Sequence, residues 1–292
     1  MVELSSHIAW PKISITTPSY NQAAFLETTI QSILSQNYPN LEYIIIDGGS
    51  TDGSVDIIKK YAQHLHFWCS ESDDGQYNAI NKGFSLSSGE IMAWLNSDDM
   101  YFPWALKTVA SIMAELPQVE WLTTLERGKW DWQGFCLQYY PVPGYSREAF
   151  LDGCYLPAMK EKDMGCIQQE STFWRRSLWN KIGGKIPLTF PLAADFNLWA
   201  QFYCHAELYA TRSPLGGFRC QEDQRSSHIE RYISEANKAL DNIREILHWM
   251  PRNRGKLMEQ WFASRYYSAK QVYRQHPDRP DGTWAIKEYR FL

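Results

Sequence analysis

The feature that most constrains the fold is an alternation of short apolar runs and amphipathic segments over residues 13–125. The apolar runs have the length of strands, and the segments between them place apolar residues at helical spacing. We therefore predict buried strands, separated by helices, at 13–17, 41–46, 65–70, 90–95 and 119–124. Strands that alternate with helices form a mostly parallel sheet with helices on both faces, so the predicted fold class is α/β and Rossmann-like.

Polar loops follow the predicted strands at the ends where the chain leaves each one. These loops read "PSYN", "DGGSTDG", "SDDG" and "NSDD". In open α/β sheets, ligands bind outside the carboxyl ends of the strands. Several polar loops on one rim therefore predict a binding site at that edge of the sheet.

The loops exclude two common ways of holding phosphate. "DGGSTDG" has neither the GxGxxG pattern of dinucleotide-binding folds nor the GxxxxGK[ST] pattern of P-loops. A divalent metal is then the obvious candidate, because Mg²⁺ and Mn²⁺ prefer carboxylate and phosphate oxygens. Asp98 and Asp99 in "NSDD" are the candidate ligands. The alternative is a helix cap, in which Ser97 or Asp98 precedes a helix that begins near Pro103.

Composition indicates which classes of partner the protein binds and in which cellular compartment we expect it. The 292 residues carry a net charge of −4, which argues against nucleic acid as the main partner. The six cysteines form no CxxC pair, so we expect reduced thiols in a cytoplasmic protein. The start "MVELSSHIAW" lacks a signal-peptide pattern, and the apolar runs are too short to cross a bilayer. The 13 tryptophans could stack on sugars, but we favour a role in the core.

The second half of the chain predicts a different organisation. Residues 126–165 show weak periodicity and many Gly, Pro and Tyr residues, which favours a loop-rich insertion over the site. Beyond it we expect a strand and helix at 171–184, and a helix at 194–204 whose first turn carries Asp195. A further helix follows at 229–249. We predict one domain at 1–228, whose two halves divide at about residue 125, and a helical C-terminal extension at 229–292.

Several stretches in fixed order carry a resemblance to a known family. They are "TTPSYNQAAFLETTIQSILSQNYPNLEYIIIDGGSTDGS", "SESDDGQYNAINKGFSLSSGEIMAWLNSDD", "QQESTFWRRSLWNKIGG" and "ADFNLW". Together they resemble the family 2 glycosyltransferases of the GT-A fold, which transfer sugars from nucleotide diphosphates. The wordings "DGQYNAINKG" and "LNSDD" are similar to those of the bacterial surface-polysaccharide branch.

The resemblance implies that the domain at 1–228 is catalytic, with a nucleotide-binding half to about 125 and an acceptor half at 126–228. It also implies a role for individual residues. It places Asp195 as the catalytic base, Asp98 and Asp99 on the metal, and Glu170 and Gln169 in the sugar or acceptor pocket. It assigns donor-nucleotide contacts to Pro18, Tyr20, Asp47, Asp74, Gly75, Asn81, Lys82 and Asp98. Mn²⁺ or Mg²⁺ would be the cofactor. A UDP-sugar is the favoured donor, with guanine and thymine as alternative bases, and the acceptor would be a hydroxyl of a glycan or lipid-linked glycan.

The chain departs from the family pattern at three places, one of which is that Phe196 and Asn197, and not a second acid, follow Asp195. Asn96 stands where many relatives carry an acid, and Gln221 stands where a histidine often follows "FRx". The metal or phosphate contact of that histidine would fall to Gln221, to His228 or to neither. A catalytically silent subunit that binds nucleotide-sugars or glycans is therefore the alternative to an enzyme. The Gln-x-x-Arg-Trp signature of processive polymerases is missing, which favours transfer of one sugar.

The tail from Pro251 to Arg274 is rich in basic and aromatic residues. Its apolar positions, which run from Leu257 to Ala269, suggest a helical stripe. Such a helix could lie on the inner face of an anionic membrane. The alternatives, which we favour together over the membrane, are docking onto the catalytic domain or onto a second copy in a homo-oligomer.

Overall fold

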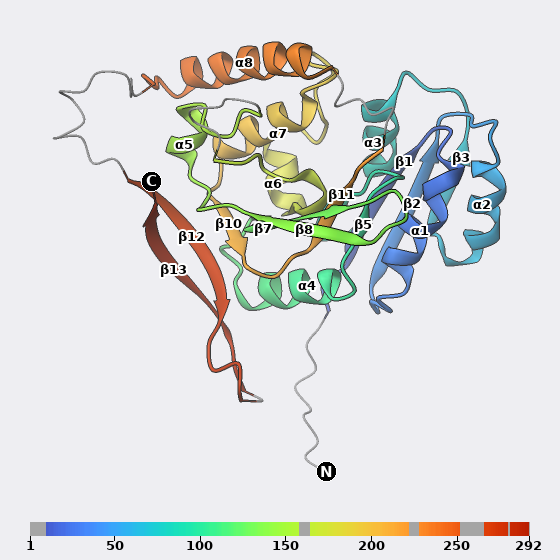
Figure 1. The fold of residues 1–292 in the computed structure, drawn as a ribbon, viewed down its shortest axis with the longest axis horizontal. Coiled ribbons are helices and arrows are strands. Elements are labelled where there is room, and N and C mark those ends of the chain that lie inside the picture. Colours follow the sequence, from blue (N-terminus) through green and yellow to red (C-terminus); the bar gives the residue numbers. More distant parts are fainter. Residues whose placement is uncertain (1–9, 158–163, 222–227, 252–265, 280, 292) are drawn as a thin grey trace.

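The computed structural model describes residues 10–157, 164–221, 228–251, 266–279 and 281–291 (Figure 1). In these ranges the chain forms a nine-stranded mixed sheet with helices on both faces, and a smaller four-stranded sheet. The predicted α/β class and mostly parallel order are confirmed for the strands that begin the chain.

The N-terminal elements follow the predicted alternation closely. They are β1 (Ile13–Ser19), α1 (Ala23–Leu34), β2 (Leu41–Asp47), α2 (Ser54–Tyr61), a 3-10 turn (Ala62–His64), β3 (Phe67–Ser70), α3 (Gln76–Ser85), β4 (Ile91–Trp94), β5 (Met100–Tyr101), α4 (Ala105–Glu115) and β6 (Trp121–Thr124). The strands β3, β2, β1 and β4 lie side by side in that order and run parallel. Their carboxyl ends therefore meet at one edge, as the sequence predicts.

The later elements complete both sheets. They are β7 (Glu126–Trp130), β8 (Cys136–Pro141), α5 (Arg147–Leu151), a 3-10 turn (Gln169–Ser171), β9 (Phe173–Arg175), α6 (Arg176–Lys181), α7 (Ala194–Tyr203), β10 (Leu208–Thr211), β11 (Gly216–Arg219), α8 (Ile229–Ile246), β12 (Tyr267–Arg274) and β13 (Trp284–Phe291). The large sheet has the order β13-β12-β10-β6-β9-β4-β1-β2-β3, and the small one β5-β11-β7-β8. The large sheet thus runs without a break across the boundary that we predicted near residue 125.

Two apolar cores cover the two faces of the large sheet. Successive residues of β4 show the division, since Ile91 and Ala93 belong to the core with α1 and α4, whereas Met92 and Trp94 belong to the core with α3, α5, α6, α7 and α8. Figure 1 shows α4 and α8 on opposite sides of the molecule. The second core is rich in aromatic rings, with buried tryptophans at 94, 121, 174, 179 and 199. The expectation that tryptophan fills the core is confirmed at these positions.

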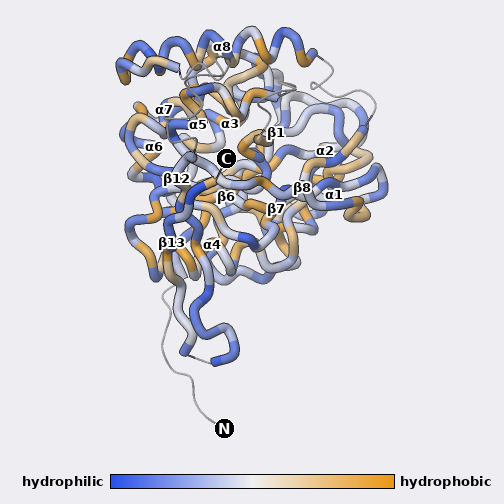
Figure 2. Tube along the Cα trace, turned by 60° about the vertical axis from the view of Figure 1, so that its left-hand side comes forward, coloured by the Kyte–Doolittle hydropathy of each residue, from blue (hydrophilic) through white to orange (hydrophobic). Residues whose placement is uncertain are grey.

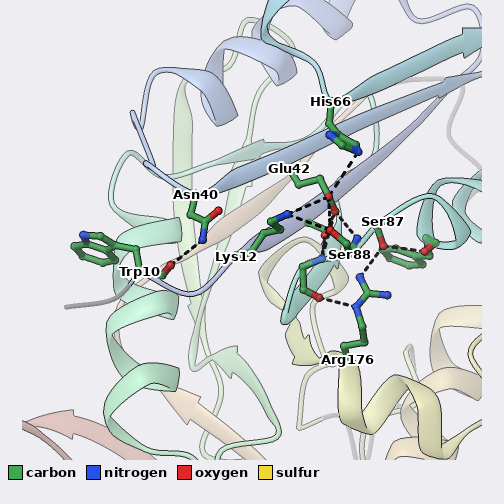
Figure 3. A network of polar contacts seen from close by, with 11 residues as sticks. Trp10, Lys12, Asn40, Glu42, His66, Ser87, Ser88 and Arg176 are labelled. Atoms are coloured by element: carbon green, nitrogen blue, oxygen red, sulfur yellow. Dashed lines mark hydrogen bonds and ion pairs between the residues drawn. The ribbon is translucent and has the colours of Figure 1, made fainter. Parts of the chain in front are cut away.

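A buried carboxylate ties together the ends of the strands that lie opposite the predicted site (Figure 3). Glu42 at the start of β2 accepts hydrogen bonds from the Ser14 hydroxyl at 2.5 Å and from the backbone N–H and hydroxyl of Ser88 at 2.6 and 2.7 Å. Lys12 and His66 lie 3.8 and 3.7 Å from its Oε1. Burial alone would raise the pKa of Glu42, but these hydrogen bonds outweigh it and lower the pKa to about 2.

The predicted loop-rich insertion is wrong for its first part. Residues 126–141 form the antiparallel hairpin of β7 and β8, closed by a turn in which the N–H of Gly134 donates to the carbonyl of Asp131 at 3.1 Å. Gly134 has a φ of +91°, which a glycine adopts without strain. The hairpin is hard to recognise in the sequence because all six residues of β8 are exposed, so no apolar alternation marks the strand.

The helical C-terminal extension is also wrong beyond α8. Part of the predicted helical stripe lies outside the described residues, but Tyr267–Arg274 is strand β12, which pairs with β13 and joins β10 in parallel. Buried Tyr267 and Ala269 alternate with exposed Ser268, the period of a strand. The described part of this tail therefore docks onto its own sheet, whose edge it extends. Among the helices of the described ranges, none combines the length and apolar character needed to span a bilayer. All six cysteines carry free thiols.

Candidate active site

A cavity of about 590 Å³ opens at the carboxyl edge of the parallel strands. Its wall includes six of the residues predicted from the sequence, which are Pro18, Tyr20, Gly75, Asp98, Asp99 and Gln221. The loops after β1, β3 and β4 all contribute, as does Gly48 after β2. We call this cavity the donor pocket. The predicted convergence of the polar loops on one rim is confirmed.

Other predicted donor residues lie beside this cavity and serve the loops that form it. Asp47 is fully buried, and its Oδ2 accepts hydrogen bonds from Ser50 N–H at 2.9 Å and Ser70 Oγ at 2.6 Å. Its Oδ1 accepts a third from the Ser50 hydroxyl at 2.6 Å. Asp47 thus holds the "DGGSTDG" loop in shape. Its predicted contact with a base stays a prediction.

The two predicted donor residues on α3, Asn81 and Lys82, also bind neighbouring segments of the protein. Asn81 pairs in both directions with the backbone of Ile186, at 2.9 and 2.8 Å, and so joins α3 to the loop before α7. Lys82 binds Glu71 and the thiol of Cys69. Asp74 is exposed, and its neighbour Asp73 enters the wall of the donor pocket instead.

The Asp98–Asp99 corner is built around a buried arginine that the sequence analysis did not single out. Arg219 is 1% exposed, and its main-chain N–H donates to Oδ1 of Asp99 at 2.8 Å. Its guanidinium donates to the carbonyls of Asp98 and Trp132 at 2.6 and 2.7 Å and to the Thr28 hydroxyl at 2.9 Å. Strand β11, which pairs with β5 and β7, delivers Arg219 to this corner.

Asn96 and Gln221, which depart from the family pattern, each donate a hydrogen bond to a carboxylate of the corner. Gln221 donates from Nε2 to Oδ2 of Asp98 at 2.5 Å. Asn96 donates from Nδ2 to Oδ2 of Asp99 at 3.2 Å and accepts from Gln76 at 2.6 Å. An acid at position 96 could not donate to Asp99 in this way while ionised. His228 is exposed at the start of α8, outside the walls of both pockets, so Gln221 is the residue at the corner.

Carboxyl groups are crowded at this corner. Burial, together with repulsion from Asp98 and Glu170, raises the pKa of Asp99 well above its usual value. Burial likewise raises the pKa of Asp98, and it raises the pKa of Glu170 to about 7. A cation would relieve this cost, because an opposite charge favours the ionised form.

A divalent metal needs more ligands than the side chains of the corner supply by themselves. In the described residues, no group of three or more His, Cys, Asp or Glu side chains is arranged to hold a metal ion. Asp98 and Asp99 are the carboxylates of the corner that line the donor pocket, so diphosphate oxygens and water would have to complete the shell. That combination suits Mg²⁺ or Mn²⁺, which bind through one or two carboxylates plus substrate phosphates. The residues therefore fit such an ion together with its phosphate ligand.

A second cavity of about 440 Å³ adjoins the first. Its wall contains Asp195, Glu170 and Gln169, as predicted, together with Arg127, Lys129, Tyr140 and Tyr232. Gln76, Asn96 and Phe218 line both cavities, so the two share a wall. We call the second cavity the acceptor-side pocket. Gln169 is fixed there by bonds to the carbonyl of Trp94 at 2.7 Å and to Asn96 at 3.3 Å.

Asp195 lies in the first turn of α7, as expected, and faces this pocket. The hydroxyl of Tyr232 on α8 lies 3.2 Å from Oδ1 and 3.4 Å from Oδ2 of Asp195. Sequence reasoning missed Tyr232, Arg219, Asp73, Gln76 and Phe218. For Arg219 a signal is present in the sequence, because the arginine lies in "FRCQ", the segment that departs from the family pattern at Gln221.

The sheet order, and the carboxylates at the carboxyl edge of the sheet, agree with the GT-A glycosyltransferase fold that the sequence resembles. The chain belongs to glycosyltransferase family 2, because a model of "Glycosyl transferase family 2" matches residues 14–134 and a Mycobacterium tuberculosis relative named as a glycosyltransferase is 30% identical over 200 residues, spanning 66% of this chain and 70% of the relative.

Other relatives match with different coverage. A Rickettsia felis glycosyltransferase of uncharacterised activity is 25% identical over 235 residues, or 79% of this chain, but the chain spans only 38% of that protein. TuaG of Bacillus subtilis, whose name assigns it to teichuronic acid biosynthesis, is 38% identical over 94 residues, which cover 31% of this chain and 37% of TuaG.

Solved structures support the same fold. Residues 1–349 of S. aureus TarS in complex with UDP-GlcNAc align with a TM-score of 0.60 and 17% identity, covering 85% of this chain and 77% of that one. The mannosyltransferase PcManGT of Pyrobaculum calidifontis, solved with GDP-Man and Mn²⁺, aligns with a TM-score of 0.54 and 17% identity, covering 82% and 74%. At this identity the likeness establishes the fold.

Proposed function

We propose that the protein is a metal-dependent, inverting glycosyltransferase that moves one sugar from a UDP-sugar to a hydroxyl of a glycan or lipid-linked glycan in cell-surface polysaccharide synthesis. The observation that carries the proposal is the shared wall between the two pockets. The carboxylate corner opens into one pocket and Asp195 into the other, with Asn96 between them. A donor and an acceptor bound side by side would thus meet between the corner and the base.

The donor pocket has the parts that a nucleoside diphosphate needs. Tyr20 is 63% exposed at its rim and offers a ring face to a base. The wall carries three carboxylates, Asp73, Asp98 and Asp99, so a diphosphate needs a cation to settle there. When bound, Mn²⁺ or Mg²⁺ would be held by Asp98 and Asp99 and would stabilise negative charge on the leaving diphosphate. Uracil is proposed as the base in line with TarS, while the guanine of the Pyrobaculum donor is the alternative.

The residues of the chain would carry the remaining steps. Asp195 accepts the proton of the acceptor hydroxyl as the oxygen of that hydroxyl bonds to the anomeric carbon of the donor sugar. The bond from that carbon to the diphosphate oxygen breaks, and the nucleoside diphosphate leaves with the electron pair. Attack from the face opposite the leaving group inverts the anomeric configuration. Gln169, which bonds to Trp94 and Asn96 in the wall of the acceptor-side pocket, would bind a sugar hydroxyl there.

The acceptor-side pocket also indicates the charge of the acceptor. Arg127 and Lys129 lie two residues apart on β7, so their side chains project from the same side of the strand, and both line the pocket. Tyr140 from β8 lies beside Lys129, with the ammonium group 5.9 Å from the ring centre. This wall suits an acceptor that carries a phosphate or carboxylate as well as a sugar face.

The experiment that tests the donor site is a thermal-shift panel of UDP, GDP, dTDP and CDP, each with and without Mn²⁺. We expect UDP with Mn²⁺ to raise the melting temperature the most, because ligands that bind only the folded state stabilise it. The same rise without Mn²⁺ would contradict the metal dependence. Nucleotide binding without any turnover of sugar donors would favour a catalytically silent binding subunit.

A further inference from the structure

We propose that helix α8, in the predicted C-terminal extension, completes the active site, with Tyr232 and Glu235 as positioning residues for Asp195. This inference rests on the proposed function. It goes beyond it by assigning a role to a helix that the motifs of the family do not reach. Figure 2 shows α8 along the edge of the molecule, with hydrophilic and hydrophobic residues alternating along it. Its buried residues include Glu235, an acid on an otherwise apolar inner face.

Glu235 holds the backbone just before the first residue of α7. The residue before α7 is Ala193, whose methyl side chain cannot accept a hydrogen bond, and no side-chain cap is present. Instead, Oε2 of Glu235 accepts hydrogen bonds from the N–H groups of Leu192 and Ala193 at 2.7 and 3.2 Å. The charge of Glu235 also suits the positive end of the α7 dipole. Because Asp195 lies two residues after Ala193, this contact sets where the carboxylate stands.

Arg231 in turn holds Glu235. Its Nε donates to Oε1 of Glu235 at 3.1 Å, one helical turn away on α8. Oε2 remains on α7 while Oε1 is engaged with Arg231. Glu235 is only 8% exposed, so its orientation is restricted by the core around it.

Tyr232 acts directly on the base. Its hydroxyl lies within 3.4 Å of both oxygens of Asp195 and donates to the carboxylate. Burial and the adjacent Asp195 raise the pKa of Tyr232, so the proton that it donates stays in place at neutral pH. A hydrogen bond to the ionised form favours that form, which is the form a base requires.

Other ionisable groups also face this region. Tyr77 on α3 and the Cys166 thiol interact with Tyr232, and Glu170 and Arg127 lie near Cys166. A change in the pH profile must therefore be assigned by removing the Tyr232 hydroxyl alone. Tyr232→Phe does this without removing the ring.

The test compares Tyr232→Phe with Tyr266→Phe, an exposed tyrosine outside the site. For Tyr232→Phe we expect kcat to fall about ten- to hundredfold, with an unchanged KM for the donor, because one hydrogen bond to a charged group is lost. The acid limb of the pH–rate profile should move to higher pH. An NMR titration of ¹³C-labelled aspartate should show a higher pKa for Asp195 in this variant, and that readout needs no turnover.

Glu235 is tested by conservative rescue. We expect Glu235→Ala to lower kcat and Glu235→Gln to restore part of it, because the Gln carbonyl still accepts from Leu192 and Ala193. Glu245→Gln, at an exposed position of the same helix, should match the wild type. If the wild type turns over its donor and Tyr232→Phe matches it in kcat, pH profile and Asp195 titration, the inference about α8 is wrong while the proposed function stands. Absence of wild-type turnover with every donor would instead overturn the proposed function.

Discussion

The main-chain N–H of Arg219 donates a 2.8 Å hydrogen bond to Oδ1 of Asp99, across 120 positions of sequence. The guanidinium of the same residue holds the carbonyl of Asp98 at 2.6 Å. Two adjacent carboxylates repel each other, and the buried arginine is a positive group of the protein that lies beside them. Arg219 thus binds both the backbone of the corner, at Asp98, and the carboxylate of Asp99.

Replacing Arg219 should therefore destabilise the protein as well as the site. We expect Arg219→Lys to lower the free energy of unfolding by about 1–3 kcal/mol, because one ammonium cannot reach Asp98, Trp132 and Thr28 together. Urea denaturation measures this loss. Arg212→Lys, at an exposed ion pair with Glu126, is the matched control and should change little. If the two variants were equally stable, the buried hydrogen bonds of Arg219 would not contribute to the free energy of unfolding.

Asp99→Asn should separate stability from donor binding. The amide oxygen can still accept from Arg219, and loss of a buried charge beside Asp98 and Glu170 removes repulsion, but the new NH₂ group faces Nδ2 of Asn96 and loses the hydrogen bond that Asn96 donates. Because these effects oppose each other, we expect the melting temperature of the free protein to change little, and the stabilisation by UDP with Mn²⁺ to be lost. Differential scanning fluorimetry measures both quantities. A variant that kept the full UDP–Mn²⁺ shift would remove Asp99 from the metal site.

Glu42 should make stability depend on acid pH. Its pKa is about 2 in the folded protein, against an ordinary value of 4.5, so the ionised form is favoured by folding. The stabilisation is complete above pH 4.5 and is lost as the pH falls towards 2. Glu42→Gln should lower stability at pH 7 by about 1–3 kcal/mol and flatten this pH dependence. Urea titrations from pH 7 to 3 measure it, with exposed Asp56→Asn as control. Parallel curves for Glu42→Gln and the wild type would contradict the assignment.

Arg127 and Lys129 should determine the preference for charged acceptors. We expect the wild type to use methyl glucuronide better than methyl glucoside, and the double variant Arg127→Gln/Lys129→Gln to lose about tenfold of that preference in kcat/KM. Lys107→Gln, at an exposed position of α4, is the control. A preference that the double variant retained in full would assign the two cations to another role.

Gly83 is a packing prediction that does not depend on function. A Cβ at this position of α3 would lie 2.3 Å from Cγ2 of Thr16 on β1, closer than atoms can approach. We expect Gly83→Ala to destabilise the protein by about 1–3 kcal/mol, despite the better helix propensity of alanine. Ser85→Ala on the exposed side of the same helix should have a small effect. Chemical denaturation compares the two variants. If Gly83→Ala left the free energy of unfolding unchanged, α3 would be able to shift away from β1 without cost.

The parts of the fold that could be predicted are those in which neighbouring residues share a role. The strands β1, β2 and β4 are buried on both faces and are rich in β-branched or apolar residues, and Asp98 and Asp99 come shortly after β4. Asp195 was placed in a first turn by its position before an apolar helix. These inferences need only local sequence.

The parts that could not be predicted depend on pairings between distant segments. Arg219 enters the site because β11 pairs with β5 and β7, and nothing near residue 219 specifies those partners. Tyr232 lies on α8, where its spacing suits a core position as well as a contact with Asp195. In the tail, alternation in "YSAKQVYR" was present, but aromatic residues before it favoured a helical period.

The most direct measurement is release of UDP from a UDP-sugar by the wild type, Asp99→Asn and Asp195→Asn proteins, each with Mn²⁺ or with EDTA. We predict release by the wild type only with Mn²⁺, and at least a hundredfold less by either variant, with Asp195→Asn still showing the thermal shift by UDP and Mn²⁺. Undiminished release in EDTA, or by Asp195→Asn, would contradict a carboxylate-held metal on one side of the shared wall and a base on the other.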